Sequence, residues 1–329
     1  MDSVMSTLFA TIAAIMFGTY SIMIADIIKN ILKLQESDGR ISQEITAGFF
    51  QFMVFVGAVS TTLIVFASSI IMCSLHQVGS IISLLEIDWV SMGFLILVHF
   101  VVNYIVILAI FREAVSRIFA LVAYSPIFAA IMAYIILGET ITVFQAAIIV
   151  FCLVGLTLVM DPQHYIKESS IKNLFMMLLI PIIFGLQNTL FKIVLIKAMN
   201  SIASLSTETG HLLFVISVIN IIIFASTALL ALLLFIFLRL KQQQKHMYST
   251  STRSNLIVLM GGLLFAVGSI ASFLALNVQK VALVVTIITM QSIIPILYGK
   301  IRLRETLSKK MMLGFIIAIA GVLILTYSA

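Results

Sequence analysis

The chain has 329 residues, of which 62% are hydrophobic and only 10% are charged, and its mean hydropathy is +1.23. A soluble domain carries about 25% charged residues, so this composition excludes a water-soluble globule and points to a lipid bilayer as the solvent. The formal net charge is +6, but the Lys and Arg residues lie between apolar runs, without interleaved aromatic residues. This charge therefore predicts contacts with lipid headgroups and no nucleic-acid partner.

Ten apolar runs follow one another along the chain, separated by polar or turn residues. A membrane-spanning helix needs about 20 such residues, and a backbone in lipid must satisfy its own hydrogen bonds, so we expect each run to be a transmembrane helix. The first run is expected to be a retained span rather than a signal peptide, because it is too long and no basic residue precedes it. The runs cover approximately residues 4–28, 47–73, 90–111, 117–138, 143–160, 173–196, 211–238, 255–277, 281–301 and 311–327.

No motif of an enzyme interrupts these runs. The sequence has no phosphate-binding loop, dinucleotide fingerprint, zinc-binding His/Glu pattern or nucleophile elbow. Cys73 and Cys152 lie in apolar runs without metal-ligand or redox spacing. The sequence therefore predicts a protein that is not an enzyme and that has no cofactor and no metal site.

The second half of the chain repeats the first at a shift of 166 residues. The stretch "GETITVFQAAIIVFCLVGLTLVM" (138–160) aligns without a gap with "RETLSKKMMLGFIIAIAGVLILT" (304–326), and Glu139 falls on Glu305. The same shift aligns Gly155 with Gly321, Leu108-Ala109 with Leu274-Ala275 and Asn103 with Ser269. Residues 1–161 and 162–329 are therefore expected to be two five-helix repeats.

Five spans is an odd number, so the second repeat must enter the membrane in the direction opposite to the first. The expected fold class is thus an all-α integral membrane protein with ten transmembrane helices arranged as two inverted five-helix repeats. Inverted repeats are typical of secondary transporters, which hold their site near mid-membrane between the halves. A duplication retained only for packing is the alternative.

A single carboxylate, Glu139, separates the fourth apolar run from the fifth. Thr142 followed three residues later by Gln145 forms a capping-box pattern, which predicts a helix start there. Glu139 would then lie in a tight hairpin at the membrane surface, where a carboxylate near a helix N-terminus is favourable. We expect a structural role for Glu139 and for its counterpart Glu305, with a substrate contact as the alternative.

The stretches "ALVAYSPIFAAIMAYIILGETIT" and "KVALVVTIITMQSIIPILYGKIRLRETLS" resemble the two EamA repeats of the drug/metabolite transporter superfamily. That pattern has Ser-Pro in the fourth span, a Gly-Glu hairpin, and an aromatic-glycine pair in the first span, as in Phe17-Gly18 and Phe184-Gly185. The second repeat departs from it, since Arg304 replaces the hairpin glycine and the proline lies about one turn later. The resemblance covers nearly the whole chain and implies a central cavity lined by spans 1, 3, 4, 6, 8 and 9.

Polar side chains inside the apolar runs gather near the middle of the same six spans. Such groups are costly in lipid, so they face a cavity or another helix. We therefore predict one substrate site near mid-membrane that combines side chains from all six spans. Its expected residues are Tyr20, His99, Asn103, Tyr124, Gln187, Asn188, Lys192, Ser269 and Gln291.

Several of these residues have a second interpretation. The amide side chains could instead hold neighbouring helices together. His99 is the mid-span group that titrates nearest neutral pH, and a neutral, hydrogen-bonded histidine is favoured over a proton carrier. Lys192 lies near the end of its span, where its ammonium group could extend to the membrane surface.

The expected function is a secondary transporter that moves a small organic metabolite across the cell membrane by alternating access. A phosphate ester would suit two intramembrane cations, and Lys192 is the one candidate, so an amino acid, an amine or a neutral metabolite is favoured as the substrate. The alternative is a membrane protein that does not transport, such as a lipid-binding or scaffold protein. Coupling to protons or other ions and the oligomeric state stay open.

The charges also predict an orientation. With ten spans both termini lie on one side, and 16 of the 19 Lys and Arg residues fall in the connections on the opposite side. Cytoplasmic loops carry the excess of Lys and Arg, so the termini are expected outside the cell. The resemblance implies the reverse, with both termini in the cytoplasm.

Overall fold

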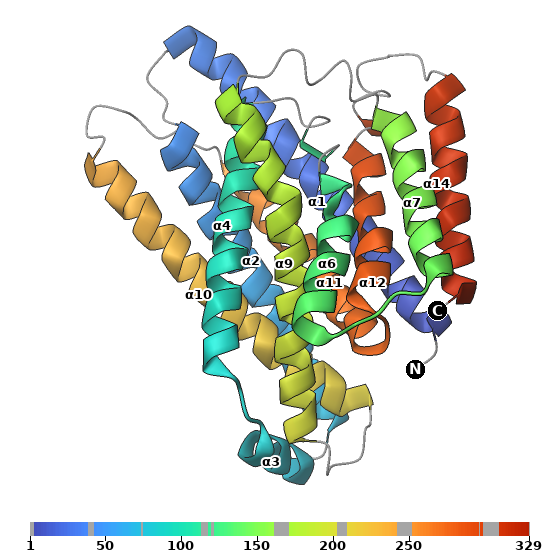
Figure 1. Cartoon of the computed structure of the whole chain (residues 1–329). Coiled ribbons are helices and arrows are strands. Elements are labelled where there is room, and N and C mark those ends of the chain that lie inside the picture. The colour runs from blue at the N-terminus through green and yellow to red at the C-terminus, as the bar shows by residue number, and fades with distance from the viewer. Residues whose placement is uncertain are drawn as a thin grey trace.

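The computed structural model of the protein describes residues 3–38, 43–73, 75–112, 118–119, 122–160, 171–202, 209–241, 252–295, 297–298 and 309–328. Nearly all of these residues are helical, and no strand occurs among them (Figure 1). The predicted all-α fold is confirmed. Large apolar side chains such as Val90, Val143 and Leu240 are exposed on the outside of the bundle, as expected for a surface that faces lipid.

The helices follow the order of the apolar runs. In chain order they are α1 (Ser3–Asp38), α2 (Gln43–Met72), α3 (Leu75–Leu84), α4 (Trp89–Arg112), α6 (Ser125–Leu137), α7 (Val143–Met160), α9 (Ile171–Ser201), α10 (Thr209–Lys241), α11 (Thr252–Val278), α12 (Val281–Ile288), the 3-10 helix η1 (Thr289–Ser292) and α14 (Lys309–Ser328).

Six helices in the described ranges are long and apolar enough to cross a membrane, so the protein has the composition of a multi-pass membrane protein. They are Ser3–Ile28, Gln43–Met72, Trp89–Phe111, Leu179–Ser201, Gly210–Lys241 and Ser254–Val278. Shorter apolar helices cover Ser125–Leu137, Val143–Leu158, Val281–Pro295 and Met312–Ile324.

The structure differs from the predicted runs at two places. The short helix α3 lies between α2 and α4, where the sequence predicted a connection. The ninth run is not one regular helix, because α12 tightens into η1 after Ile288. Pro295 has no N–H to donate to the carbonyl of Gln291, one turn earlier, and a helix that loses this bond commonly changes its winding.

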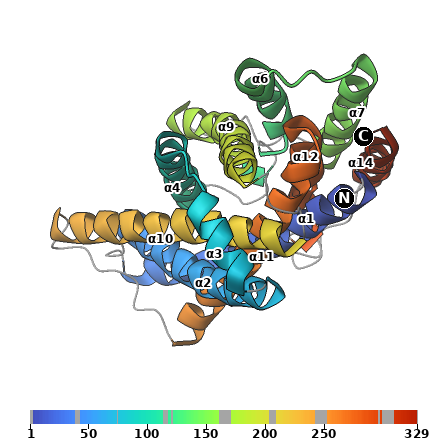
Figure 2. The ribbon, with the colours of Figure 1, turned by 90° about the horizontal axis from the view of Figure 1, so that it is seen from below.

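The helices pack in pairs around a centre. α2 packs on α10, α1 on α11, and α4 and α6 on α9. α7 and α14 lie side by side at one edge of the bundle, in both views (Figures 1 and 2). The first and last described residues lie at the same end of the bundle as the α6–α7 connection (Figure 1), and we call this the terminal end.

Glycines allow α2 and α11 to approach closely. A Cβ atom on Gly262 would overlap the carbonyl oxygen of Val54, and one on Gly57 would overlap the carbonyl oxygen of Leu259. The helices α7 and α14 also approach closely, because a Cβ atom on Gly155 would lie 2.6 Å from the backbone nitrogen of Ala318. Backbone meets backbone at these sites, so rotation of a side chain cannot relieve the overlap.

We expect Gly262→Ala to destabilise the protein by about 1–3 kcal/mol, the range for overpacking a tight interior. Gly93→Ala is the matched control, because its added methyl group meets no neighbouring helix within 4 Å among the described residues. The control should keep or raise stability by up to about 1 kcal/mol, since alanine favours the helix. Thermal unfolding of the purified variants in detergent measures both, and equal midpoints would contradict the close α2–α11 approach.

Candidate functional site

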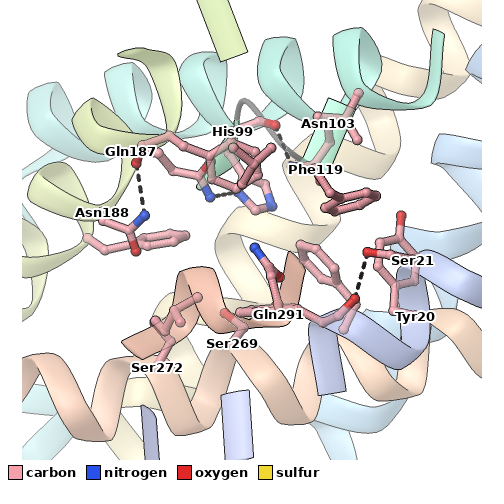
Figure 3. Close-up of a pocket in the computed structure, with 17 residues that line it drawn as sticks. Tyr20, Ser21, His99, Asn103, Phe119, Gln187, Asn188, Ser269, Ser272 and Gln291 are labelled. Carbon is pink, nitrogen blue, oxygen red and sulfur yellow. Dashed lines mark hydrogen bonds between the residues drawn. The ribbon is translucent and has the colours of Figure 1, made fainter. Parts of the chain in front are cut away.

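A cavity lies in the centre of the bundle, with about 60 Å³ of space for the centres of water-sized molecules. Its walls come from α1, α4, α9, α11, α12 with η1, and the residues just before α6 (Figure 3). No Asp, Glu, Lys or Arg belongs to its lining in the part of the chain that the structure describes. One water needs about 10–15 Å³ of such space, so the cavity has room for a few waters or one small solute.

The structure brings seven of the nine predicted site residues to this cavity: Tyr20, His99, Asn103, Gln187, Asn188, Ser269 and Gln291. The other two predicted residues, Tyr124 and Lys192, do not belong to its described lining. The hydroxyl of Tyr124 lies 3.0 Å from Oγ1 of Thr157, so it is turned toward α7. Lys192 forms an ion pair with Glu139 near the terminal end.

His99 and Gln187 form a direct bond between α4 and α9 (Figure 3). Nε2 of Gln187 lies 2.8 Å from Nδ1 of His99. With the amide N–H as the donor, Nδ1 accepts, so the imidazole is neutral and carries its proton on Nε2. Both side chains are buried, and neither Nε2 of His99 nor Oε1 of Gln187 has a hydrogen-bond partner among the described residues. The pair thus presents one unused donor and one unused acceptor.

Four phenylalanine rings hold the imidazole in place. The ring centroids of Phe55, Phe191, Phe224 and Phe265 lie 5.2 to 6.0 Å from that of His99. These rings come from α2, α9, α10 and α11. Because contacts from four helices restrict the ring, the direction in which Nε2 points is set by the packing of the bundle.

The asparagines of the lining bond to their own helices. Nδ2 of Asn103 donates to the backbone oxygen of His99, and Nδ2 of Asn188 to that of Phe184, each at 2.8 Å. Such bonds, one turn back, satisfy a polar side chain within a membrane helix. The interpretation as links between helices fits Gln187, whose amide bonds to His99 and joins α9 to α4. It also fits Ser269, whose hydroxyl donates to Oδ1 of Asn220 at 2.7 Å and joins α11 to α10.

Aromatic side chains that were not among the predicted site residues make up much of the remaining wall. They are Phe17, Phe119, Phe184, Phe191 and Phe265. The repeated aromatic-glycine pair was the available signal, because its two aromatic members, Phe17 and Phe184, both line the cavity. Tyr20 packs edge-on against Phe265 with the ring centroids 5.3 Å apart.

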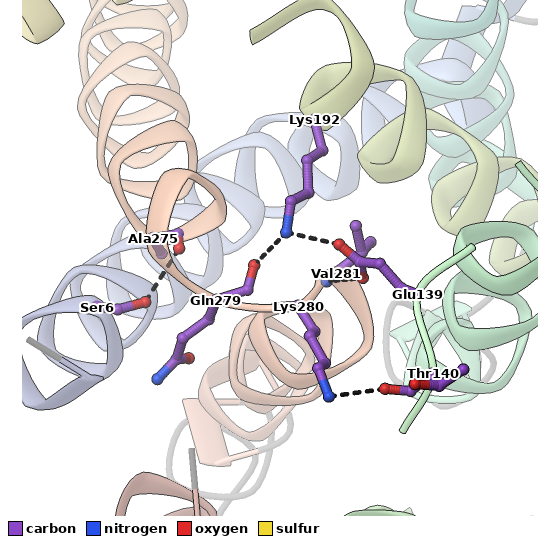
Figure 4. A network of polar contacts seen from close by, with 8 residues as sticks. All are labelled: Ser6, Glu139, Thr140, Lys192, Ala275, Gln279, Lys280 and Val281. Atoms are coloured by element: carbon purple, nitrogen blue, oxygen red, sulfur yellow. Dashed lines mark hydrogen bonds and ion pairs between the residues drawn. The ribbon is translucent and has the colours of Figure 1, made fainter. Parts of the chain in front are cut away.

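A polar network joins the α6–α7 hairpin to α9 and to the α11–α12 turn (Figure 4). Nζ of Lys192 lies 2.6 Å from Oε1 of Glu139 and 2.6 Å from the backbone oxygen of Gln279. Oε2 of Glu139 accepts the backbone N–H of Val281 at 2.9 Å. Across the same hairpin, Nζ of Lys280 donates to the backbone oxygen of Thr140 at 2.7 Å.

These contacts refine the prediction for Glu139. The capping box is confirmed, because the Thr142 hydroxyl and the Gln145 amide oxygen each accept the other residue's backbone N–H at 3.1 Å. Glu139 does lie at a helix N-terminus, but this is the N-terminus of α12, which lies about 140 residues further along the chain. Its counterpart Glu305 lies outside the described residues.

A second ion pair lies at the terminal end, between Lys197 on α9 and Asp88 at the start of α4. Asp88 also accepts the Ser91 hydroxyl at 2.6 Å and the backbone N–H of Val90 at 3.2 Å, so it caps α4. The hydrogen bond from Lys197, followed by that from Ser91, lowers the pKa of Asp88 well below its usual range. The carboxylate therefore stays ionised at any physiological pH.

No protein-family model matches the sequence, and no curated protein matches it. Among solved structures, 16 chains match. One of them, described only as "Crystal structure of protein", superposes with a TM-score of 0.65 at 13% sequence identity, over 98% of this chain and 97% of its own length. At this identity the likeness establishes a shared fold along the whole chain and nothing about function.

Proposed function

We propose that the protein is a secondary transporter that moves a small organic metabolite across a membrane by alternating access through the central cavity. One observation carries this proposal: buried polar side chains from both halves of the chain line a single cavity inside an apolar bundle. Packing alone does not explain such groups, because a polar side chain in a membrane core costs free energy. As expected from the sequence, an amino acid, an amine or a neutral metabolite suits a cavity whose described lining has no Asp, Glu, Lys or Arg.

We further propose ten spans in two inverted repeats, with the four shorter apolar helices as additional spans. The packing supports this proposal. The helices α1, α2, α4, α6 and α7 correspond in order to α9, α10, α11, α12 and α14. When each helix is replaced by its counterpart, every main helix–helix contact becomes another contact that the structure also contains. For example, the α1–α11 contact becomes α9–α4, and α6–α9 becomes α12–α1.

Two glycines support the same exchange. A Cβ atom on Gly18 would lie 2.6 Å from the side chain of Ile294, and one on Gly185 would lie 2.9 Å from the side chain of Phe128. Phe128 and Ile294 are 166 residues apart, which is the shift found in the sequence. The aromatic-glycine helices α1 and α9 therefore meet equivalent positions in the opposite repeats.

The network around Glu139 fits a closed state of such a transporter. It links the hairpin of one proposed repeat to two segments of the other, and Nε2 of Gln279 adds a bond to the backbone oxygen of Ser3 at 3.1 Å. Ion pairs and hydrogen bonds can separate and form again without repacking a core. We infer that these contacts hold the halves together at the terminal end while the cavity faces the other side.

Uptake into proteoliposomes tests the proposal. The purified protein should accelerate the movement of at least one small solute from a panel of amino acids, amines and neutral metabolites, with saturation at high concentration. The alternative, a lipid-binding or scaffold protein, predicts no protein-dependent flux for any solute under any ion gradient. An enzyme is not favoured, because His99 is the sole histidine in the described lining and no carboxylate or cysteine accompanies it.

Orientation is tested by cysteine labelling, after Cys73 and Cys152 are replaced by alanine. The charge distribution predicts that the terminal end lies outside the cell. Thr140→Cys, in the exposed hairpin at that end, should then react with a membrane-impermeant reagent in intact cells. Ser308→Cys, outside the described residues, should react only after permeabilisation. The reverse pattern would place both termini in the cytoplasm, as the resemblance implies.

A further inference from the structure

The cavity is suited to an uncharged solute. Its described lining contains no acidic or basic side chain that could balance a charge. His99 does not supply a positive charge either, because its Nδ1 accepts a hydrogen bond from Nε2 of Gln187, and an imidazolium has no acceptor. A charged solute in an apolar bundle without a counter-charge would be strongly disfavoured.

The polar atoms of His99 and Gln187 that have no partner also indicate which hydrogen-bonding groups the solute carries. His99 presents the Nε2 proton as a donor, and Gln187 presents Oε1 as an acceptor. His99 is 1% exposed and Gln187 is 5% exposed, so bulk water does not readily satisfy these atoms. The two groups are joined by their own hydrogen bond, so they form one fixed unit. A solute that accepts from one and donates to the other would satisfy both.

The surrounding rings favour a flat solute. Phe17, Phe191 and Phe265 belong to the lining, and Phe17 packs against Phe265 with ring centroids 5.3 Å apart. Aromatic walls of this kind stabilise a planar ring by stacking or edge contacts. The space of about 60 Å³ is narrow, so a single ring fits the site better than a fused or extended molecule.

We propose that the cavity selects an uncharged, single-ring solute that carries a carbonyl next to an N–H group, which is the chemistry of cyclic amides and imides. The carbonyl oxygen accepts the Nε2 proton of His99, the N–H donates to Oε1 of Gln187, and the ring lies between the phenylalanines. This assignment of a substrate class rests on the proposed transport function, and it narrows the three classes considered above to one.

Uracil and 1,3-dimethyluracil are the probes, because they share the ring and the carbonyls while only uracil has N–H donors. The full-length protein in proteoliposomes should take up radiolabelled uracil with saturation. An excess of unlabelled uracil should abolish this uptake, whereas 1,3-dimethyluracil should compete at least about tenfold more weakly, the factor that corresponds to roughly one hydrogen bond. Phenylalanine and benzylamine, which are charged, should not compete.

Variants connect the effect to the two side chains. Gln187→Met keeps the length of the side chain and removes the acceptor, and it should weaken uracil binding at least about tenfold. Thr227→Val is the control, because Thr227 is buried on α10, bonds to its own helix and does not line the cavity. Its binding should match that of the unchanged protein. If Gln187→Met does not fold, the competition by uracil and by 1,3-dimethyluracil in the unchanged protein still tests the proposal.

The outcomes separate this inference from the proposed function. Equal competition by uracil and its dimethyl derivative would overturn the assignment of the donor and acceptor. Flux of phenylalanine or benzylamine without flux of uracil would overturn the substrate class and leave the transporter proposal standing. If no solute moves, the transport proposal fails, and a thermal shift of the detergent-solubilised protein by uracil but not by dimethyluracil would still support the cavity assignment.

Discussion

His99→Ala is expected to lower transport by about 5- to 150-fold at matched amounts of folded protein. The substitution removes an imidazole that lines the cavity and whose Nε2 has no partner among the described residues, and it leaves the buried amide of Gln187 without its partner. An unsatisfied buried polar group costs about 1–3 kcal/mol, which corresponds to that factor in an equilibrium. Initial uptake rates in proteoliposomes, normalised to monodisperse protein, measure the effect.

The result for His99→Ala is compared with those for two other variants. Asn103→Ala changes the same face of α4 one turn later and should also reduce transport. Glu139→Gln, away from the described lining, should reduce the amount of folded protein more than the transport by each folded molecule. Wild-type rates for His99→Ala would remove His99 from the site. A large loss of rate for fully folded Glu139→Gln would show that this carboxylate acts in the transport cycle.

Lys192→Gln is expected to destabilise the protein by about 2–4 kcal/mol, somewhat less than the cost of removing one partner from a fully buried ion pair, because both side chains are partly buried. The side chains of Lys192 and Glu139 are only 12% and 15% exposed, so water cannot readily replace the lost charge. Lys197→Gln is the matched control, since it changes the same residue type on the same helix. Lys197 is 53% exposed, and an exposed pair contributes only about 0–1 kcal/mol.

The free energy of unfolding in mixed detergent micelles measures both variants. The double variant Glu139→Gln/Lys192→Gln should lose less stability than the sum of its single variants, because it leaves no charge unpaired. Gln at position 139 also retains an oxygen that can accept the Val281 N–H. Equal losses for Lys192→Gln and Lys197→Gln, or strict additivity in the double variant, would contradict a strong ion pair between Lys192 and Glu139.

Much of the helical fold could be predicted from the sequence, because the distribution of apolar residues is a property of the chain itself. The apolar runs predict helices wherever about 20 such residues follow one another. The polar residues in mid-run predicted that His99, Asn103 and Gln187 would lie together, and all three line one cavity, since polar groups in lipid have few alternatives to a cavity. The capping box at Thr142 could be predicted because its bonds span only three residues.

Only the tertiary structure decided which way each side chain points and which residue it meets. Tyr124 turns to Thr157 on α7, and Lys192 turns to Glu139, although depth alone assigned both to the cavity. A residue's depth follows from its position in a run, but its direction depends on the rotation of the helix against neighbours far away in the chain. For the same reason the sequence did not predict the contact of Glu139 with the start of α12 or the phenylalanines around His99. These contacts join residues far apart in the chain, and an apolar residue becomes part of a cavity wall only when distant helices pack together.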